Sequence, residues 1–263
     1  RDPAKLTYSD YVTLQHDRET YVDILTDHHE SAESVAGLSD GWVATLRDLF
    51  VPLRFPLHVL QMAGLYVGQM SPSAFITNCA NFQAADELRR IQRVAYHTKA
   101  LAKAHGDELA LTASARDPWT TADAWQPLRE TLERLLTVRD WGEAFVALNL
   151  AVKPAVDTAV NEQLAALASR NDDEYLGLLL AEFQRDSERS RAWTTALVRY
   201  ALDRDPALAE VVSGWTSIWQ PRADAAVSGL APLFGRAPEP IGPAQVVAAA
   251  AATREALTAA AGL

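Results

Sequence analysis

The longest uninterrupted helical pattern lies between Pro72 and Gly106, where neither glycine nor proline occurs in a stretch rich in Ala, Leu, Gln and Arg. Serine at position 71 suits a helix N-cap, and proline at position 72 suits the first helical turn. A helix over about 71–105 is therefore predicted, with a length of about 50 Å at the usual rise per residue. Such a length is typical of a helical bundle.

The rest of the chain has the same character. Its 12 glycines and 13 prolines fall mainly between long stretches of helix-forming residues, and no stretch shows sustained alternation of β-branched and polar residues. Further helices are predicted at about 50–70, from 121 onward, and at 139–169, 172–203, 206–218, 220–233 and 244–261. The segments 107–119 and 235–243 are predicted to be linkers. The fold class is therefore all-α, and residues 50–105 and 139–203 each resemble a helix pair of a bundle.

Three regions follow from this pattern: an N-terminal arm over 1–39, a helical domain over 40–234, and a Pro/Gly linker with an Ala-rich peripheral helix over 235–263. The arm mixes apolar and polar residues, so it needs another surface to pack against. Tyrosine combines a large apolar area with a polar tip and is common at interfaces. The candidate interface residues are Tyr8, Tyr11, Tyr21 and Tyr66.

Charge and composition exclude several classes of function. The formal net charge is -10 and the pI is about 5.1, which argues against nucleic acid as a partner. No apolar run is long enough for a membrane span, and no secretory signal pattern is present. The single cysteine, Cys79, cannot form an internal disulfide. We therefore expect a cytoplasmic protein without a membrane partner.

Charged residues interrupt two of the predicted helices on their apolar sides. Glu87 shares a face with Ile91 and Val94, and Arg90 follows it at a spacing that allows an ion pair. A second group shares a stripe with Leu179 and Trp193 at steps of three and four residues. This second group consists of Glu182, Asp186 and Arg189. Arg185 follows Glu182 by three residues, and Glu143 lies on the helix that leads toward the group.

The spacing of these acids invites comparison with di-iron carboxylate bundles. Those bundles require a lone Glu from each of two helices and a Glu-x-x-His motif from each of two others. Here Arg90 and Arg185 stand where the two histidines would be, and the helix over 50–70 has no acid at all. A guanidinium stays charged and cannot ligate iron. We therefore predict a degenerate metal site filled by ion pairs, with no catalytic, cofactor-binding or metal-binding residue in this chain.

Several segments resemble the β subunits of toluene, phenol, alkene and propane monooxygenase hydroxylases. The similarity is longest over Tyr66–Arg93 and includes the sequence Asn-Cys-Ala-Asn-Phe-Gln-Ala-Ala-Asp-Glu-Leu-Arg-Arg. It continues through Asp140–Asn149, Val152–Pro154 and Asp186–Trp193, and through the expected turns at Gly214-Trp215 and Trp219–Pro221. In all, the resemblance covers about residues 5 to 234 and leaves the Ala-rich tail outside.

The resemblance implies a ferritin-like subunit without its own metal that pairs with a catalytic α subunit, and commonly with a γ subunit, as (αβγ)2 or (αβ)2. The di-iron centre would belong to the α subunit, and flavin and iron–sulfur groups to a reductase. With NADH and a coupling protein, such a system inserts one oxygen atom of O2 into a hydrocarbon. The hydrocarbon itself would be selected in the α subunit.

Two alternatives remain beside this hypothesis. One is a stand-alone di-iron oxygenase that uses the unusual ligand set Glu87, Glu143, Glu182 and Asp186. The other is a helical regulatory or storage protein unrelated to oxygenases. Other residues are weaker candidates for a functional site. His97 and Cys79 are expected to be packing residues, and no phosphate-binding loop or dinucleotide motif is present.

Overall fold

The computed structural model describes residues 2–31 and 33–263, and every regular element in that part of the chain is helical. The helices are α1 (Tyr8–Ser31), α2 (Asp40–Leu49), α3 (Arg54–Met70), α4 (Ala74–His105), α5 (Thr112–Thr121), α6 (Gln126–Leu135), α7 (Trp141–Val146), α8 (Lys153–Asp157), α9 (Leu164–Arg170), α10 (Glu174–Arg204), α11 (Leu208–Phe234) and α12 (Pro243–Ala261). Short 3-10 turns η1 (Ser34–Gly37), η2 (Val51–Leu53) and η3 (Asp107–Ala110), and two π-helical segments, η4 (Ala147–Val152) and η5 (Thr158–Gln163), complete the set.

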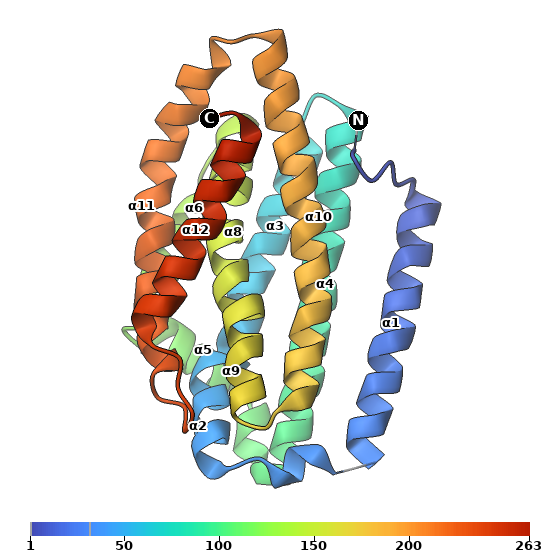
Figure 1. Ribbon diagram of the computed structural model, residues 1–263, viewed down its shortest axis with the longest axis vertical. Coiled ribbons are helices and arrows are strands. Elements are labelled where there is room, and N and C mark those ends of the chain that lie inside the picture. Colours follow the sequence, from blue (N-terminus) through green and yellow to red (C-terminus); the bar gives the residue numbers. More distant parts are fainter. Residues whose placement is uncertain (1, 32) are drawn as a thin grey trace.

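Two helix pairs form the centre of the bundle, as the sequence predicts (Figure 1). In the first pair, α3 and α4 lie side by side and are joined by residues 71–73. The predicted start of α4 is displaced, because Ser71 ends α3 and Ser73 is the N-cap that accepts a hydrogen bond from the Phe75 N–H at 3.3 Å. In the second pair, the rod from α7 to α9 turns back into α10 at residues 171–173.

The rod from Trp141 to Arg170 is one continuous helical path, as predicted, but it contains two π segments. These segments lie on either side of the single α-helical turn Lys153–Asp157. A π turn holds an extra residue, and such turns are frequent at functional sites. The whole of η4 and most of η5 are buried, so the rod runs through the interior of the molecule.

Three local predictions are wrong. No helix is predicted over 40–49, yet Ser39 caps α2 there by accepting from the Trp42 N–H, and the Trp42 indole is fully buried. The supposed linker 107–119 contains η3 and most of α5. The two helices predicted over 206–233 are one helix, α11, which passes through Pro221. An interior proline costs about 3 kcal/mol, and here packing of α11 along α6 and α12 offsets that cost.

The C-terminal helix α12 lies on the outside of the bundle against α8, α10 and α11 (Figure 1). Its outer face is exposed, as expected of a peripheral helix. Its inner face is a buried stripe consisting of Val246, Ala250, Arg254, Leu257 and Ala261. Val246 and Ala250 belong to the main hydrophobic core, so this helix adds apolar packing in spite of its small side chains.

At the right-hand edge of Figure 1, α1 runs along α10 and α4 and stands apart from the other helices. Val22 and Leu25 anchor it in the main core, and the ring of Tyr11 stacks on Phe82 with a centroid distance of 4.3 Å. The rest of its inner face is polar. Within the described residues, no helix combines the length and the apolar character that a membrane span requires.

Candidate functional site

Four charged side chains meet in the middle of the bundle, and we call them the quartet: Glu87 and Arg90 from α4, and Lys153 and Asp157 from α8. Arg90 donates to Glu87 at 2.8 Å and to Asp157 at 2.9 Å. The Lys153 ammonium contacts Glu87, and it lies 2.8 Å from Asp157. Each carboxylate therefore bridges the same two cations, with one oxygen toward each, and the four side chains form a closed ring.

Two neutral side chains complete the environment of the ring. Asn161 accepts from Arg90 at 2.9 Å, and Ser187 of α10 donates to Asp157 at 2.8 Å. Asn161 also donates to the Ser187 hydroxyl at 3.1 Å, which connects α10 to η5. All four carboxylate oxygens of the quartet thus have a partner, although Glu87 is 0% exposed and Asp157 only 1%.

The ring is electrically balanced, with two acids and two cations. Burial alone opposes ionisation of Asp157, but the charges of Lys153 and Arg90 outweigh it and hold the pKa of that carboxyl well below its usual range. Burial likewise opposes the ammonium of Lys153, yet Asp157 and Glu87 raise the pKa of that lysine. Asp157 and Lys153 therefore both stay ionised at neutral pH. A buried ion pair is tolerated when its charges are matched and hydrogen-bonded in this way.

The donor set of the quartet does not fit a di-iron centre. Such a centre needs about four carboxylates and two imidazoles that converge, and here two carboxylates converge on an ammonium and a guanidinium. Among residues 2–31 and 33–263, no group of three or more His, Cys, Asp or Glu side chains is placed to hold a metal ion. The buried His97 packs against Phe50 and Tyr175 instead, and burial lowers its pKa, so its ring is neutral.

A second charged network, which we call the arm seam, joins α1 to α4 and α10. Its inner part contains Asp86, Arg89, Asp186 and Arg189. Arg89 donates to Asp186 at 2.9 Å, and Arg189 contacts both aspartates. From α1, Gln15 donates to both aspartates at 2.8 and 3.0 Å, Arg18 pairs with Asp186, and Glu19 pairs with Arg89 and Arg93. The arm is therefore held by charges as well as by its apolar anchors.

The residues singled out in the sequence fall into separate places. Glu87 and Arg90 are in the quartet, and Asp186 and Arg189 are in the arm seam. Glu182 and Arg185 pair with each other at 3.1 Å, and the Arg185 side chain is 62% exposed. Glu143 accepts from the indole N–H of Trp219 at 3.0 Å, away from both networks. The second predicted group is therefore two groups, because neighbouring residues of α10 face different helices.

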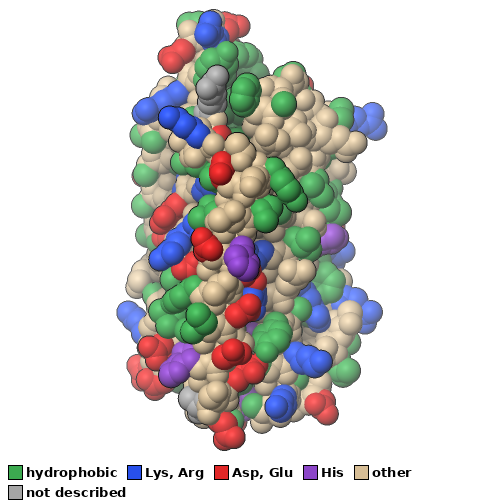
Figure 2. Space-filling view, turned by 90° about the vertical axis from the view of Figure 1, so that its right-hand side faces the viewer, with side chains coloured by type: hydrophobic (Ala, Val, Ile, Leu, Met, Phe, Trp, Pro, Cys, Tyr) green, Lys and Arg blue, Asp and Glu red, His purple; other side chains and the backbone are tan. Residues whose placement is uncertain are grey.

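The candidate interface tyrosines also differ from one another. Tyr11 is buried, and its hydroxyl donates to Asp86 at 2.9 Å. Tyr66 is half-buried, and its hydroxyl donates to the Arg139 carbonyl. Tyr8 and Tyr21 remain 75% and 44% exposed on α1. Figure 2 looks onto this side of the molecule, where acidic, basic and hydrophobic side chains are interspersed over the surface.

Sequence reasoning missed half of the quartet. Lys153 and Asp157 were not candidates, although they form a charged pair four residues apart inside a run of apolar and small residues over 144–160. A charged pair inside an apolar run was the sequence signal for a buried ion pair, because a lysine in such a run is rarely buried without a partner. Asp86 and Arg89 of the arm seam were missed as well. They flank Glu87 but point to another helix.

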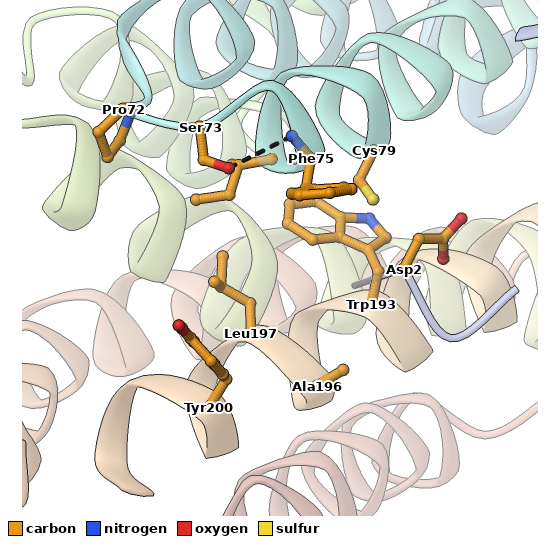
Figure 3. Close-up of a pocket in the computed structure, with 10 residues that line it drawn as sticks. Asp2, Pro72, Ser73, Phe75, Cys79, Trp193, Ala196, Leu197 and Tyr200 are labelled. Carbon is orange, nitrogen blue, oxygen red and sulfur yellow. Dashed lines mark hydrogen bonds between the residues drawn. The ribbon is translucent and has the colours of Figure 1, made fainter. Parts of the chain in front are cut away.

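The structure also has an apolar pocket of about 450 Å³ between the start of α4 and the second half of α10 (Figure 3). Phe75, Cys79, Trp193, Leu197 and Tyr200 line it, and Asp2 lies at its edge. Burial is the main cause that raises the pKa of the Cys79 thiol to about 12, so the thiol stays protonated and is no nucleophile. The pocket therefore offers apolar surface and no reactive group.

Comparison with known proteins places these features in a family. The family model described as methane/phenol/alkene hydroxylase matches residues 1–205. The hydroxylase β subunit of the toluene-4-monooxygenase system of Ectopseudomonas mendocina is 40% identical over 225 residues, which are 86% of this chain and 68% of that protein. The small hydroxylase subunit of propane 2-monooxygenase from Gordonia sp. strain TY-5 is 28% identical. That match covers 82% of this chain and 59% of the relative.

Solved structures agree with the sequence comparison. A structure of the toluene 4-monooxygenase hydroxylase with toluene in its resting active site has a TM-score of 0.85 and 38% identity, and the match covers 88% of this chain and 76% of that one. Phenol hydroxylase from Pseudomonas sp. OX1 has a TM-score of 0.89 over 100% of this chain and 77% of that one, but at 21% identity it supports the fold alone. The chain therefore belongs to the methane, phenol and alkene hydroxylase family, among the β subunits of multicomponent monooxygenase hydroxylases.

Proposed function

We propose that this chain is a noncatalytic, structural subunit of a di-iron monooxygenase hydroxylase. The observation that carries the proposal is the quartet, in which side-chain cations take the carboxylates that a metal centre would need. No chemical step is assigned to the chain's own residues. Its contribution is a rigid bundle whose central helices α4, α8 and α10 are held by the ring and its neutral partners.

The catalytic di-iron centre would lie in an α subunit bound to this chain. The relatives support this division of labour, because their names mark them as β or small subunits of hydroxylase components. A γ subunit, a coupling protein and a reductase with flavin and iron–sulfur groups complete the proposed system, assembled as (αβγ)2 or (αβ)2. Since NADH supplies the electrons, the complex would work in the cytoplasm. Its substrate would be a hydrocarbon: aromatic, an alkene or a short alkane.

We further propose that the exposed aromatic residues of the arm contact the partner subunit. Tyr8 and Tyr21 expose large rings on α1, while the inner face of the same helix is engaged by the arm seam. Because exposed tyrosines are enriched at protein interfaces, the double variant Tyr8→Ala/Tyr21→Ala should weaken association with α. Tyr11→Ala would disturb the arm itself and is not a clean interface probe.

The proposal is tested by separating the two subunits. This chain and the α subunit are produced alone and together, and iron content, hydrocarbon oxidation and the intact mass of the complex are measured. We expect iron to follow α, oxidation to require both chains with the electron-transfer proteins, and a complex that contains equal numbers of both. A purified single chain that retains two irons and oxidises a hydrocarbon would overturn the proposal, as would an active α subunit that never binds this chain.

A further inference from the structure

We propose that the bundle contains a buried water-binding site beside the quartet, formed by the side-chain amides of Gln83 and Asn149 and by the ammonium of Lys153. The ligand is a water molecule that is hydrogen-bonded to these three groups. This inference goes beyond the proposed function and does not rest on it, because it concerns the hydrogen bonding of the chain's own interior.

A stripe of side chains at steps of four residues runs along the rod from α7 to α9 and faces α4 and α10. It consists of Phe145, Asn149, Lys153, Asp157 and Asn161. Phe145 packs against Trp193 of α10 with ring centroids 5.3 Å apart, and the last three members contact the quartet or belong to it. In a regular α-helix, each step of four would turn the stripe by about 40°. The π segments η4 and η5 widen the period and keep the stripe, including Asn149, on one face.

Gln83 lies opposite Asn149 across the centre of the bundle. The contact of Glu87 with Lys153 is followed on both segments, one turn further along, by the next contact of the quartet, so the segments run in the same direction. Gln83 precedes Glu87 by four residues, and Asn149 precedes Lys153 by the same step. The indole of Trp193 donates to Gln83 Oε1 at 3.2 Å, and this side chain separates the two amides from the apolar pocket in Figure 3.

Both amides are buried, and their hydrogen bonding is incomplete within residues 2–31 and 33–263. Gln83 is 2% exposed and Asn149 is 3% exposed. In this part of the chain, Asn149 has no partner for its oxygen or its nitrogen, and Gln83 has none for its nitrogen. A buried polar group without a hydrogen bond is strongly unfavourable. Three such atoms on two facing side chains therefore indicate a ligand between them.

The ammonium of Lys153 adds a further donor, and side-chain length provides the space. An ammonium has three N–H donors, and within the described part of the chain the carboxylates of Glu87 and Asp157 take two of them. At the ring, Glu87 and Lys153 touch and so span the gap between the two segments. One turn earlier, asparagine is shorter than lysine, and Gln83 is turned toward α10. The two amides do not reach each other there.

The donors and acceptors of the site select water. Among the described residues, the groups left over are the N–H groups of Lys153, Gln83 and Asn149, and one acceptor, Asn149 Oδ1. The ligand must therefore carry lone pairs for the N–H groups and a hydrogen for the amide oxygen. An anion would add net charge to a ring that is already balanced and buried, which is unfavourable. A water molecule meets these demands, since buried waters typically make about three hydrogen bonds.

The test counts long-lived internal waters by oxygen-17 magnetic relaxation dispersion in the full native chain and in the variant Asn149→Leu. Leucine has a similar shape to asparagine but no polar group, so we expect one long-lived water fewer. The Tm should fall by about 3 °C or more, because Lys153 and Gln83 lose their acceptor. An unchanged number of waters would overturn the proposal. A rise in Tm would overturn it as well, because it would mean that a dry, unpaired amide had been removed.

Two further variants control for packing. Leu150→Met alters a fully buried residue of the same π segment on another face, and this swap nearly conserves volume. It should keep the native number of waters, and a loss equal to that of Asn149→Leu would contradict the assignment of the water to Asn149. Asn149→Ser retains a polar group and makes room, so it should hold at least as many waters as the native chain. A lower number would also overturn the proposal.

If Asn149→Leu does not fold, an X-ray structure of the native chain within its hydroxylase provides the decision. Density for a water within about 3.2 Å of both the Asn149 amide and the Lys153 ammonium supports the inference. An Asn149 amide in direct contact with Gln83 or Lys153, without such density, overturns it. Density for an ion or a larger ligand at this position overturns the assignment to water. None of these measurements depends on monooxygenase activity.

Discussion

The quartet and the arm seam are both networks of acidic and basic side chains, but only the quartet forms a closed ring. Every charge of the quartet is buried and every carboxylate oxygen is engaged inside one ring. The arm seam is open: its inner aspartates Asp86 and Asp186 are buried, whereas the outer pair of Arg93 and Asp23 reaches the surface, where Asp23 is 64% exposed. The closed ring joins helices in the centre of the bundle, whereas the open seam attaches a helix that lies on the outside.

The difference also shows in what each network connects. The quartet links α4 to α8 and reaches α10 through Ser187, all within the central bundle. The arm seam links α1 to α4 and α10, and it supplements the few apolar residues with which α1 enters the core. Loss of a charge should therefore destabilise the whole domain in the first case and the attachment of one helix in the second.

The largest expected effect follows from Lys153→Met in the quartet. Removing this cation leaves a buried carboxylate without its partner, so the free energy of unfolding should fall by about 3–5 kcal/mol. Urea denaturation of the full chain measures the loss. The double variant Lys153→Met/Asp157→Leu removes both charges and should recover most of it, because the pair of Glu87 and Arg90 stays balanced. A double variant as unstable as the single one would contradict the idea of a matched ring.

A smaller effect is expected from Asp186→Ala in the arm seam. Arg18 and Arg89 would lose a charged hydrogen-bond partner, at a cost of about 2 kcal/mol. The informative measurement is hydrogen exchange by segment. Amides of α1 should exchange faster while those of α8 stay protected, since the variant loosens the arm and not the ring. Equal acceleration in both helices would show that the two networks form one cooperative unit.

The smallest effect is expected from Asp23→Ala at the outer end of the seam. This carboxylate pairs with Arg93 at 2.6 Å, but its exposure means that the pair contributes less than about 1 kcal/mol. Its contribution to unfolding free energy should shrink further when NaCl is raised from 0.1 to about 1 M, because salt screens exposed charges. Under the same change the loss caused by Lys153→Met should stay nearly constant. If the stability loss caused by Asp23→Ala were as insensitive to salt as the loss caused by Lys153→Met, the distinction between the outer seam and the quartet would be wrong.

The quartet and the arm seam also show which ion pairs can be predicted from residue spacing. Spacing alone identified Glu87 with Arg90, because both are on one face of a single helix. It could not identify Lys153 and Asp157 as their partners, since they lie on another helix more than 60 residues further along the chain. It also merged Glu182, Asp186 and Arg189 into one cluster. The stripe on α10 is wide enough that its members contact different neighbours.

The sequence by itself determined that this chain is helical, where its two longest helices lie, and that Glu87 and Arg90 share one helix face. Helix periodicity and side-chain chemistry are local properties, so they survive without a structure. The tertiary structure decided that α11 continues through Pro221, that α12 joins the core, and that two distant ion pairs close into one ring. These outcomes depend on packing and on charges brought together from separate helices, which no local pattern contains.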